Sequence, residues 1–223
     1  MIEIKDLFDL DKTIAKDLFT GKTYPWEVLA PLSAFILTLG PTLPKESFTQ
    51  IGEDIWVAKD AVIAPSASLK GPLIIDAGAE IRQCAFIRGS VIVGKGTVVG
   101  NSTELKNTLL FDQVQVPHYN YVGDSVLGFH AHFGAGSITS NVKGDKSLIV
   151  IKLKDEQIPT NRKKVGALVG DYGEIGCNAV LNPGTIIGRQ AQVYPLCSVR
   201  GFVPSGSIYK GEGRCVPREE RTR

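Results

Sequence analysis

LKGPLIIDAGAEIRQCAFIRGSVIVGKGTVVGNSTEL, residues 69–105, repeats a pattern six residues long. A large aliphatic side chain opens each repeat, and a small or short side chain often follows four positions later, as Ala79 follows Ile75. Stepping by six extends the pattern back to Ile51 and forward to Phe111. Short regular repeats are typical of solenoids, in which each repeat buries its apolar face against its neighbours. The sequence therefore predicts a mainly β protein, a parallel β-helix of hexapeptide repeats. We assign it a left hand because regular six-residue faces belong to that rare class of fold, although the usual crossover rule favours a right hand.

The repeat changes phase once. It breaks near Pro117 and resumes two residues out of step at Tyr121, Leu127 and Phe133, then again from Val169 to Val199. Glycine follows many of these positions, as tight corners favour. With about three hexads to a coil, we expect roughly seven coils.

Two segments lie outside the repeat. Residues 1–48 have a helical pattern from Pro25 to Gly40, interrupted at Pro31, and we expect them to cap one end of the β-helix. The β-helix itself is expected over 49–205, with a lysine-rich insertion at about 141–164 and a tail over 206–223. The insertion either lines a site or forms a solvated loop.

Composition narrows the function classes. The formal net charge of +2 gives no strong field of one sign, so we expect neither nucleic acid nor membrane as a partner. The four cysteines lack metal-binding spacing, and free thiols are expected. The N-terminus lacks the pattern of a signal peptide, which favours a cytoplasmic protein.

Three cations are spaced by one predicted coil. Lys70, Arg88 and Lys106 are eighteen residues apart, and each follows an inward aliphatic residue. Residues one coil apart lie above one another at about 4.8 Å. Because like charges side by side are unfavourable, such a column favours an anion such as phosphate. The alternative is three side chains that splay into water.

All three histidines fall within fifteen residues. His130 and His132 alternate on a strand and could meet a metal, although no third ligand with suitable spacing accompanies them. His118 lies where the repeat slips, and breaks in a regular frame tend to be functional. We therefore predict a role for His118 and no metal.

Three segments within residues 88–141 resemble a known family: Gly100–Asn107 (GNSTELKN), His118–Asp124 (HYNYVGD) and Gly134–Asn141 (GAGSITSN). They are similar to the C-terminal acetyltransferase domain of the bifunctional N-acetylglucosamine-1-phosphate uridylyltransferase/glucosamine-1-phosphate acetyltransferase. A weaker similarity resumes over 170–199. Residues 1–50 are unlike that enzyme, and its nucleotide-transferring domain is not matched.

The resemblance implies a role for each matching position. His118 matches the general base, and Ala135 matches a position whose backbone N–H stabilises the oxyanion. The remaining matches are Arg88 and Lys106 for the sugar phosphate, Tyr121 and Asn141 for the sugar, and Ala135, Cys177 and Pro195 for acetyl-CoA.

The chain also departs from the family pattern. His132 stands where the family has an asparagine that touches the sugar, and Val142 replaces a tyrosine. The insertion after Asn141 is much longer than the family's loop. Some sugar-contacting positions are therefore altered, while the general base, the residues that bind the phosphate and the oxyanion donor remain.

These observations give three hypotheses. The first is a CoA-dependent acyltransferase that N-acetylates an amino-sugar phosphate, such as glucosamine 1-phosphate, in nucleotide-sugar biosynthesis; the family implies a homotrimer with sites between subunits. The second is a non-catalytic binding or assembly module related to sugar nucleotidyltransferases. The third is a metal-dependent hydratase that uses His130 and His132.

Overall fold

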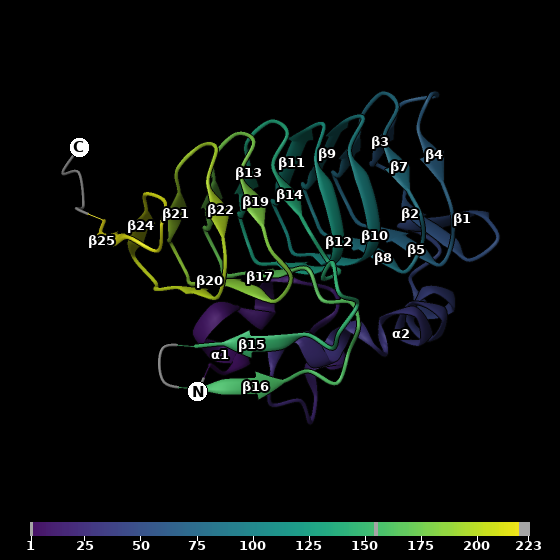
Figure 1. The fold of residues 1–223 in the computed structure, drawn as a ribbon. Helices are drawn as coiled ribbons and strands as arrows, with labels where there is room; N and C mark the ends of the chain where they lie inside the picture. The colour runs from purple at the N-terminus through teal and green to yellow at the C-terminus, as the bar shows by residue number, and fades with distance from the viewer. Residues whose placement is uncertain (1, 154–155, 219–223) are drawn as a thin grey trace.

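The computed structural model describes residues 2–153 and 156–218. The short strands form a left-handed parallel β-helix of about eight turns, one more than predicted (Figure 1). The chain winds around a triangular prism, so each turn contributes a strand to each of three faces. The aliphatic residues that open the repeats point inward, and from Leu73 to Val203 they are almost fully shielded.

We call the first side the open face, because its outward residues are only half-buried or exposed. Two of its strands are long enough to continue around the corner onto the next face. Its strands are β4 (Ser68–Leu69), β7 (Phe86–Ile87), the start of β10 (Glu104–Leu110), the start of β12 (Tyr121–Leu127), β14 (Ile138–Thr139), β19 (Val180–Leu181) and β22 (Ser198–Val199).

We call the second side the covered face, because the strands in its middle are buried on both surfaces. Its first strand pairs antiparallel with β1 (Phe48–Gly52). The strands are β2 (Ile55–Ala58), β5 (Leu73–Ile75), β8 (Val91–Val93), the ends of β10 and β12, β17 (Ala167–Val169), β20 (Thr185–Ile187) and β23 (Phe202–Val203).

The third face is one nine-stranded sheet that ends in an antiparallel pair. Its outward residues are mainly half-buried or exposed, like those of the open face. Its strands are β3 (Val62–Ile63), β6 (Glu80–Ile81), β9 (Val98–Asn101), β11 (Gln115–His118), β13 (His132–Phe133), β18 (Glu174–Ile175), β21 (Gln192–Val193), β24 (Ser207–Tyr209) and β25 (Cys215–Pro217).

The register corrects the predicted phase break. Ile87 pairs with Leu105, eighteen residues on, but Leu105 pairs with Val122, only seventeen on. One residue is lost at the corner after Leu105 and another at the corner after Val122. The repeat therefore does not break at Pro117. As a result, Val122 points inward, and Tyr121 does not. The periodicity alone could not place these gaps, because several adjacent residues are apolar.

The shortened corners use residues that tolerate a left-handed backbone. Asn107 has φ 47° and Asp124 has φ 48°. Asn and Asp adopt this region more readily than other residues with a side chain, because their short polar groups can hydrogen-bond locally. Both corners border the cationic column, so the irregularity falls beside the candidate site.

The N-terminal segment was predicted to cap one end of the solenoid. It lies instead along the covered face (Figure 1). It comprises α1 (Ile4–Leu7), α2 (Leu32–Leu39) and four 3₁₀ turns: Leu10–Lys12, Lys16–Phe19, Pro25–Leu29 and Gly40–Thr42. The predicted interruption at Pro31 is confirmed, because a 3₁₀ turn ends before it and α2 begins after it.

Aromatic packing and one buried carboxylate hold this segment in place. The ring of Phe111 lies 5.1 Å from that of Phe8 and 6.0 Å from that of Phe19, measured between centroids. Asp171 accepts hydrogen bonds from the Asp9 and Phe129 backbone N–H groups, both at 2.8 Å. The N-terminal segment therefore shields the covered face. The sequence pattern did not predict this packing.

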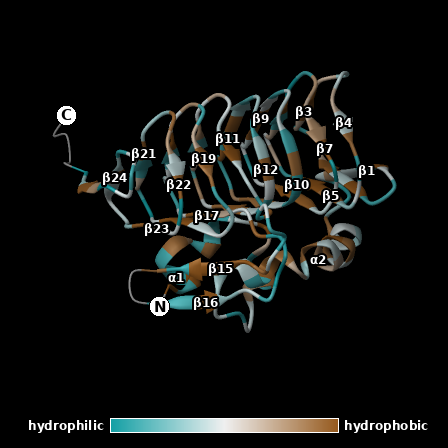
Figure 2. Ribbon diagram, in the orientation of Figure 1, coloured by the Kyte–Doolittle hydropathy of each residue, from teal (hydrophilic) through white to brown (hydrophobic). Residues whose placement is uncertain are grey.

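The insertion after Asn141 forms a hairpin of β15 (Val150–Lys152) and β16 (Gln157–Pro159). It buries Ile149, Ile151 and Ile158 rather than projecting into solvent as a loop. Figure 2 shows hydrophobic residues along β15 and in the neighbouring N-terminal segment, where both lie under the solenoid. In the described ranges, no helix has the length and apolar character needed to cross a membrane.

Candidate active site

One corner of the prism carries four of the predicted site residues in a single column. The Gly136 N–H donates to the His118 carbonyl at 3.0 Å, and the Asn178 N–H donates to the Ala135 carbonyl at 2.8 Å. The Leu196 N–H donates to the Cys177 carbonyl at 2.9 Å. The strand register therefore stacks His118, Ala135, Cys177 and Pro195 on four successive coils, between the third face and the open face.

The start of this column is accessible and held by a buried amide. The His118 and Ala135 side chains are exposed. Asn120 is only 2 % exposed; its side-chain oxygen accepts from the His118 N–H at 3.1 Å, and its amide donates to the Gly134 carbonyl at 2.9 Å. Within the described part of the chain, the Ala135 N–H donates to no acceptor, so it remains available to a ligand.

The opposite edge of the open face carries the predicted column of cations. Leu69 pairs with Ile87, and Ile87 pairs with Leu105, so the residues that follow them, Lys70, Arg88 and Lys106, occupy successive coils. The register thus confirms the stacking predicted from the spacing. The three side chains differ in exposure: Lys70 and Arg88 are exposed, while Lys106 is half-buried.

Two of these cations have altered acidity. A hydrogen bond of 2.6 Å from Arg88 Nη1 to Glu104 Oε1 raises the pKa of Arg88. Burial lowers the pKa of Lys106, and the nearby charges of Lys164 and Arg88 lower it further, although Asp124 opposes them. Lys106 is therefore a half-buried cation with two cations nearby, and an anionic ligand would stabilise its charged form.

A polar ladder runs beside the cations on the shortened corners. Asp124, 3 % exposed, accepts from the Asn107 amide at 2.9 Å and from the Asn141 amide at 2.6 Å. The Asn141 amide also donates to the Tyr121 hydroxyl at 3.2 Å. Burial, followed by the charges of Asp124 and Glu104, raises the pKa of Tyr121, so its phenol stays protonated and can donate.

The open face thus lies between the two edges that carry the predicted site residues. Tyr121 follows His118 by three residues, across the corner between the two faces, and pairs across the sheet with Glu104, the partner of Arg88. The structure brings Arg88, Lys106, Tyr121 and Asn141 into one cluster and places His118 across the same face.

His132 is the exception among the predicted sugar contacts. It lies on the third face, where its Nδ1 is 3.0 Å from Glu174 Oε2. His130 instead stacks on Tyr172, with ring centroids 5.6 Å apart. Over residues 2–153 and 156–218, no group of three or more His, Cys, Asp or Glu side chains is arranged to hold a metal ion.

Sequence reasoning missed several members of the cluster. Glu104 could have been found from its outward position beside the cations, and Asp124 from its spacing of seventeen from Asn107 and Asn141. Lys164 gave no such signal, because only the folded hairpin brings the end of the insertion back to Lys106.

Comparison with known proteins places the chain in a family. The model described as GMPPB C-terminal domain matches residues 69–204. A "Bifunctional protein GlmU" of Methanococcus maripaludis is 30% identical over 190 residues, covering 84% of this chain and 46% of that protein. A "Bifunctional sugar-1-phosphate nucleotidylyltransferase/acetyltransferase" of Sulfurisphaera tokodaii is 31% identical over 166 residues, covering 66% of this chain and 41% of that protein.

Among solved structures, a hexapeptide transferase family protein of Anaplasma phagocytophilum has a TM-score of 0.39 and 19% identity, covering 74% of this chain and 79% of its own. The acetyltransferase domain of PglB from Neisseria gonorrhoeae, in complex with acetyl coenzyme A, has a TM-score of 0.34 and 16% identity, covering 74% and 57%. The chain spans less than half the length of the two curated relatives above. Because the family model matches more than half of it, the chain belongs to the GMPPB C-terminal domain family, with a hexapeptide β-helix related to GlmU-type acetyltransferase domains.

Proposed function

We propose that this protein is a CoA-dependent acyltransferase that N-acetylates an amino-sugar phosphate. The observation that carries the proposal is the arrangement of the open face. An exposed histidine and a backbone N–H without an acceptor in the described residues lie along one edge, and several cations lie along the other, with Tyr121 between them. Such a face can hold a phosphate at one side and an acyl donor at the other.

The acceptor would be anchored through its phosphate. Arg88 and Lys106 lie on adjacent coils, so both can bond one phosphate group. The Tyr121 hydroxyl and the Asn141 amide then face the sugar ring and can hydrogen-bond its hydroxyl groups. Anchoring at these points would direct the amine toward His118.

The transfer step then uses two groups of the column. The nitrogen of the sugar amine forms a bond to the thioester carbonyl carbon, and His118 accepts the proton that this amine loses. The Ala135 N–H donates to the oxyanion that develops. The C–S bond then breaks, the amide remains on the sugar, and the proton passes to the departing CoA sulfur.

Acetyl-CoA would lie along the same column. The exposed corner continues from Ala135 to Cys177 and Pro195, and at its end lies a hollow of about 770 Å³. Lys210 and Arg214 line that hollow and suit the phosphates of the nucleotide part. A homotrimer would place a partner subunit against the open face and enclose the site.

A direct assay tests the proposal. We expect acetyl-CoA with glucosamine 1-phosphate or galactosamine 1-phosphate to release free thiol, and His118→Ala to abolish the release. If neither sugar gives turnover above the His118→Ala control, the proposal fails for these acceptors.

The second candidate is a non-catalytic binding module, which the position of His132 favours, since this predicted sugar contact lies on the third face beside Glu174 and outside the cluster. Under this reading the cations bind a sugar phosphate or nucleotide sugar without turnover. Ligand binding that is unchanged in His118→Ala, together with no thiol release by the wild-type protein, would favour it.

A further inference from the structure

Lys70, the first cation of the column, has no role in the acceptor site described above. Its N–H donates to the Ile87 carbonyl at 2.9 Å, just as the Arg88 N–H donates to the Leu105 carbonyl at 2.8 Å one coil later. At about 4.8 Å per coil, the Lys70 backbone lies roughly 10 Å from that of Lys106. Arg88 and Lys106 suffice for one phosphate, which leaves Lys70 to bind a second group.

Lys70 leans toward Arg88 across a shared aromatic ring. Lys70 Nζ lies 5.8 Å from the centroid of the Phe86 ring, and Arg88 Cζ lies 6.0 Å from it. Arg88 is paired with Glu104, whereas no carboxylate pairs with Lys70 anywhere in residues 2–153 and 156–218. The column therefore begins with an uncompensated cation that points along the open face.

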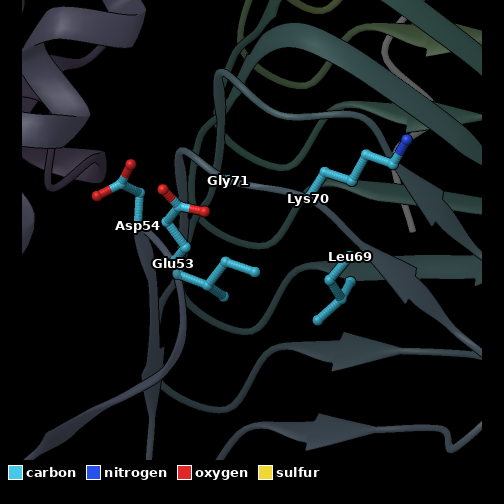
Figure 3. Close-up of a pocket in the computed structure, with 6 residues that line it drawn as sticks. Glu53, Asp54, Leu69, Lys70 and Gly71 are labelled. Carbon is cyan, nitrogen blue, oxygen red and sulfur yellow. The ribbon is translucent and has the colours of Figure 1, made fainter.

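A hollow of about 520 Å³ lies beside Lys70 at the start of the solenoid. Glu53 and Asp54 line it together with Ile55, Leu69 and Gly71. Its volume lies in the usual range of small-molecule sites. Figure 3 shows the Glu53 and Asp54 carboxylates at one side and the Lys70 side chain extending away from them. The hollow thus offers a cation toward the column and carboxylate acceptors at the far side.

These features form one line along the solenoid axis. It runs from the Tyr121–Asn141 pair to Lys106, Arg88 and Lys70, and ends in the hollow. A ligand complementary to this line would carry hydrogen-bond donors, such as hydroxyl groups, at both ends. Its middle part would be negatively charged over two or three coils. Carboxylates commonly accept from the hydroxyl groups of a ribose.

We propose that the acceptor is a nucleoside diphosphate-linked amino sugar. The phosphate next to the sugar binds Arg88 and Lys106, the second phosphate binds Lys70, and the ribose hydroxyl groups donate to Glu53 and Asp54. The placement of the sugar rests on the proposed function, but the diphosphate site does not, because it can be measured without acetyl transfer.

The test is calorimetric titration without acetyl-CoA, using UDP-N-acetylglucosamine and N-acetylglucosamine 1-phosphate. We expect Lys70→Ala to weaken binding of the diphosphate ligand about tenfold and to change that of the monophosphate less than about twofold, since one charge-assisted hydrogen bond is lost. Lys70→Arg should retain binding. Lys106→Ala should weaken both ligands, and Lys59→Ala, at an exposed lysine outside the column, neither.

Titration with UDP and with GDP separates the contribution of the diphosphate to binding from those of the base and the sugar. The proposal is overturned if none of the three diphosphate ligands binds, or if Lys70→Ala leaves their affinity unchanged or weakens the monophosphate equally. Diphosphate binding that depends on Lys70, in a protein that releases no thiol with either sugar monophosphate, would support this site and reject acyl transfer to those monophosphates. Acetylation of glucosamine 1-phosphate with no Lys70-dependent binding would do the reverse.

Discussion

The covered face and the open face are built from the same kind of short parallel strand, but they differ in what lies over them. On the covered face the N-terminal segment and the β15–β16 hairpin shield the strands, so β5, β8, β17 and β20 are buried on both surfaces. On the open face, outward residues such as Glu104 and Tyr121 keep partial access to solvent. The difference teaches that one repeat can serve stability on one side and ligand binding on another.

The charges follow the same division. The covered side uses its buried carboxylate, Asp171, for structure: it joins the N-terminal segment, the Phe129 backbone and Arg189, whose Nη2 lies 2.7 Å away. On the open side, Lys70 has no carboxylate partner among the described residues, and Lys106 is half-buried beside the cations Lys164 and Arg88. Substitutions on the two faces should therefore separate loss of function from loss of stability.

The largest effect is expected from His118→Ala. Removing a general base should lower the rate of acetyl transfer by roughly 10² to 10⁴-fold. Because His118 is exposed, the melting temperature should stay close to that of the wild type. Steady-state rates and thermal unfolding of the same preparation check both points. A large fall in melting temperature would show that His118 has a structural role instead.

Phe111→Ala should produce the opposite pattern. The Phe111 ring is fully buried between Phe8, Phe19 and the solenoid, and truncating such a ring costs about 3–5 kcal/mol of unfolding free energy. Urea unfolding measures this loss. The ligand affinity of the protein that remains folded should be unchanged, because Phe111 lies on the covered side. Loss of affinity with stability intact would contradict the separation of the two faces.

Lys106→Arg should change a pH dependence rather than abolish binding. The pKa of Lys106 is lowered by burial and neighbouring cations, so its positive charge disappears as pH rises through that lowered value. Binding of a sugar phosphate should therefore weaken at a pH below that expected for an ordinary lysine. Arginine keeps its charge over this range, so Lys106→Arg should extend binding to higher pH. Titrations between about pH 7 and pH 10 compare the two, and identical profiles would contradict the assignment.

The smallest effect is expected from Asp76→Asn. Asp76 is 2 % exposed, and its Oδ2 is buried without a hydrogen-bond partner in the described residues. Burial raises the pKa of Asp76, so the folded state binds a proton more tightly than the unfolded state. Its contribution to stability is then present below the unfolded pKa of about 4 and is lost as pH rises through the folded pKa.

Asparagine keeps the oxygen that accepts from the Ala77 N–H and removes the charge. The variant should gain up to about 1 kcal/mol near pH 8 and nothing near pH 3, as urea midpoints at the two pH values would show. An equal gain at both pH values would rule out ionisation as the cause.

The sequence by itself determined the repeat, the prism and the stacking of the cations. A six-residue period of large aliphatic side chains can bury its apolar face only by winding, and the eighteen-residue coil then places Lys70, Arg88 and Lys106 above one another. The family resemblance supplied His118, Ala135, Cys177 and Pro195, and their common column follows from the same winding.

Only the tertiary structure decided what covers each face and where the repeat shortens. The N-terminal segment was predicted as an end cap because its pattern shows an apolar side but not the surface that accepts it. The shortened corners depend on the left-handed backbone of Asn107 and Asp124, which hydrogen bonds across coils stabilise. Lys164 reaches Lys106 only because the hairpin folds back. Such contacts join residues far apart in the chain, so no local pattern encodes them.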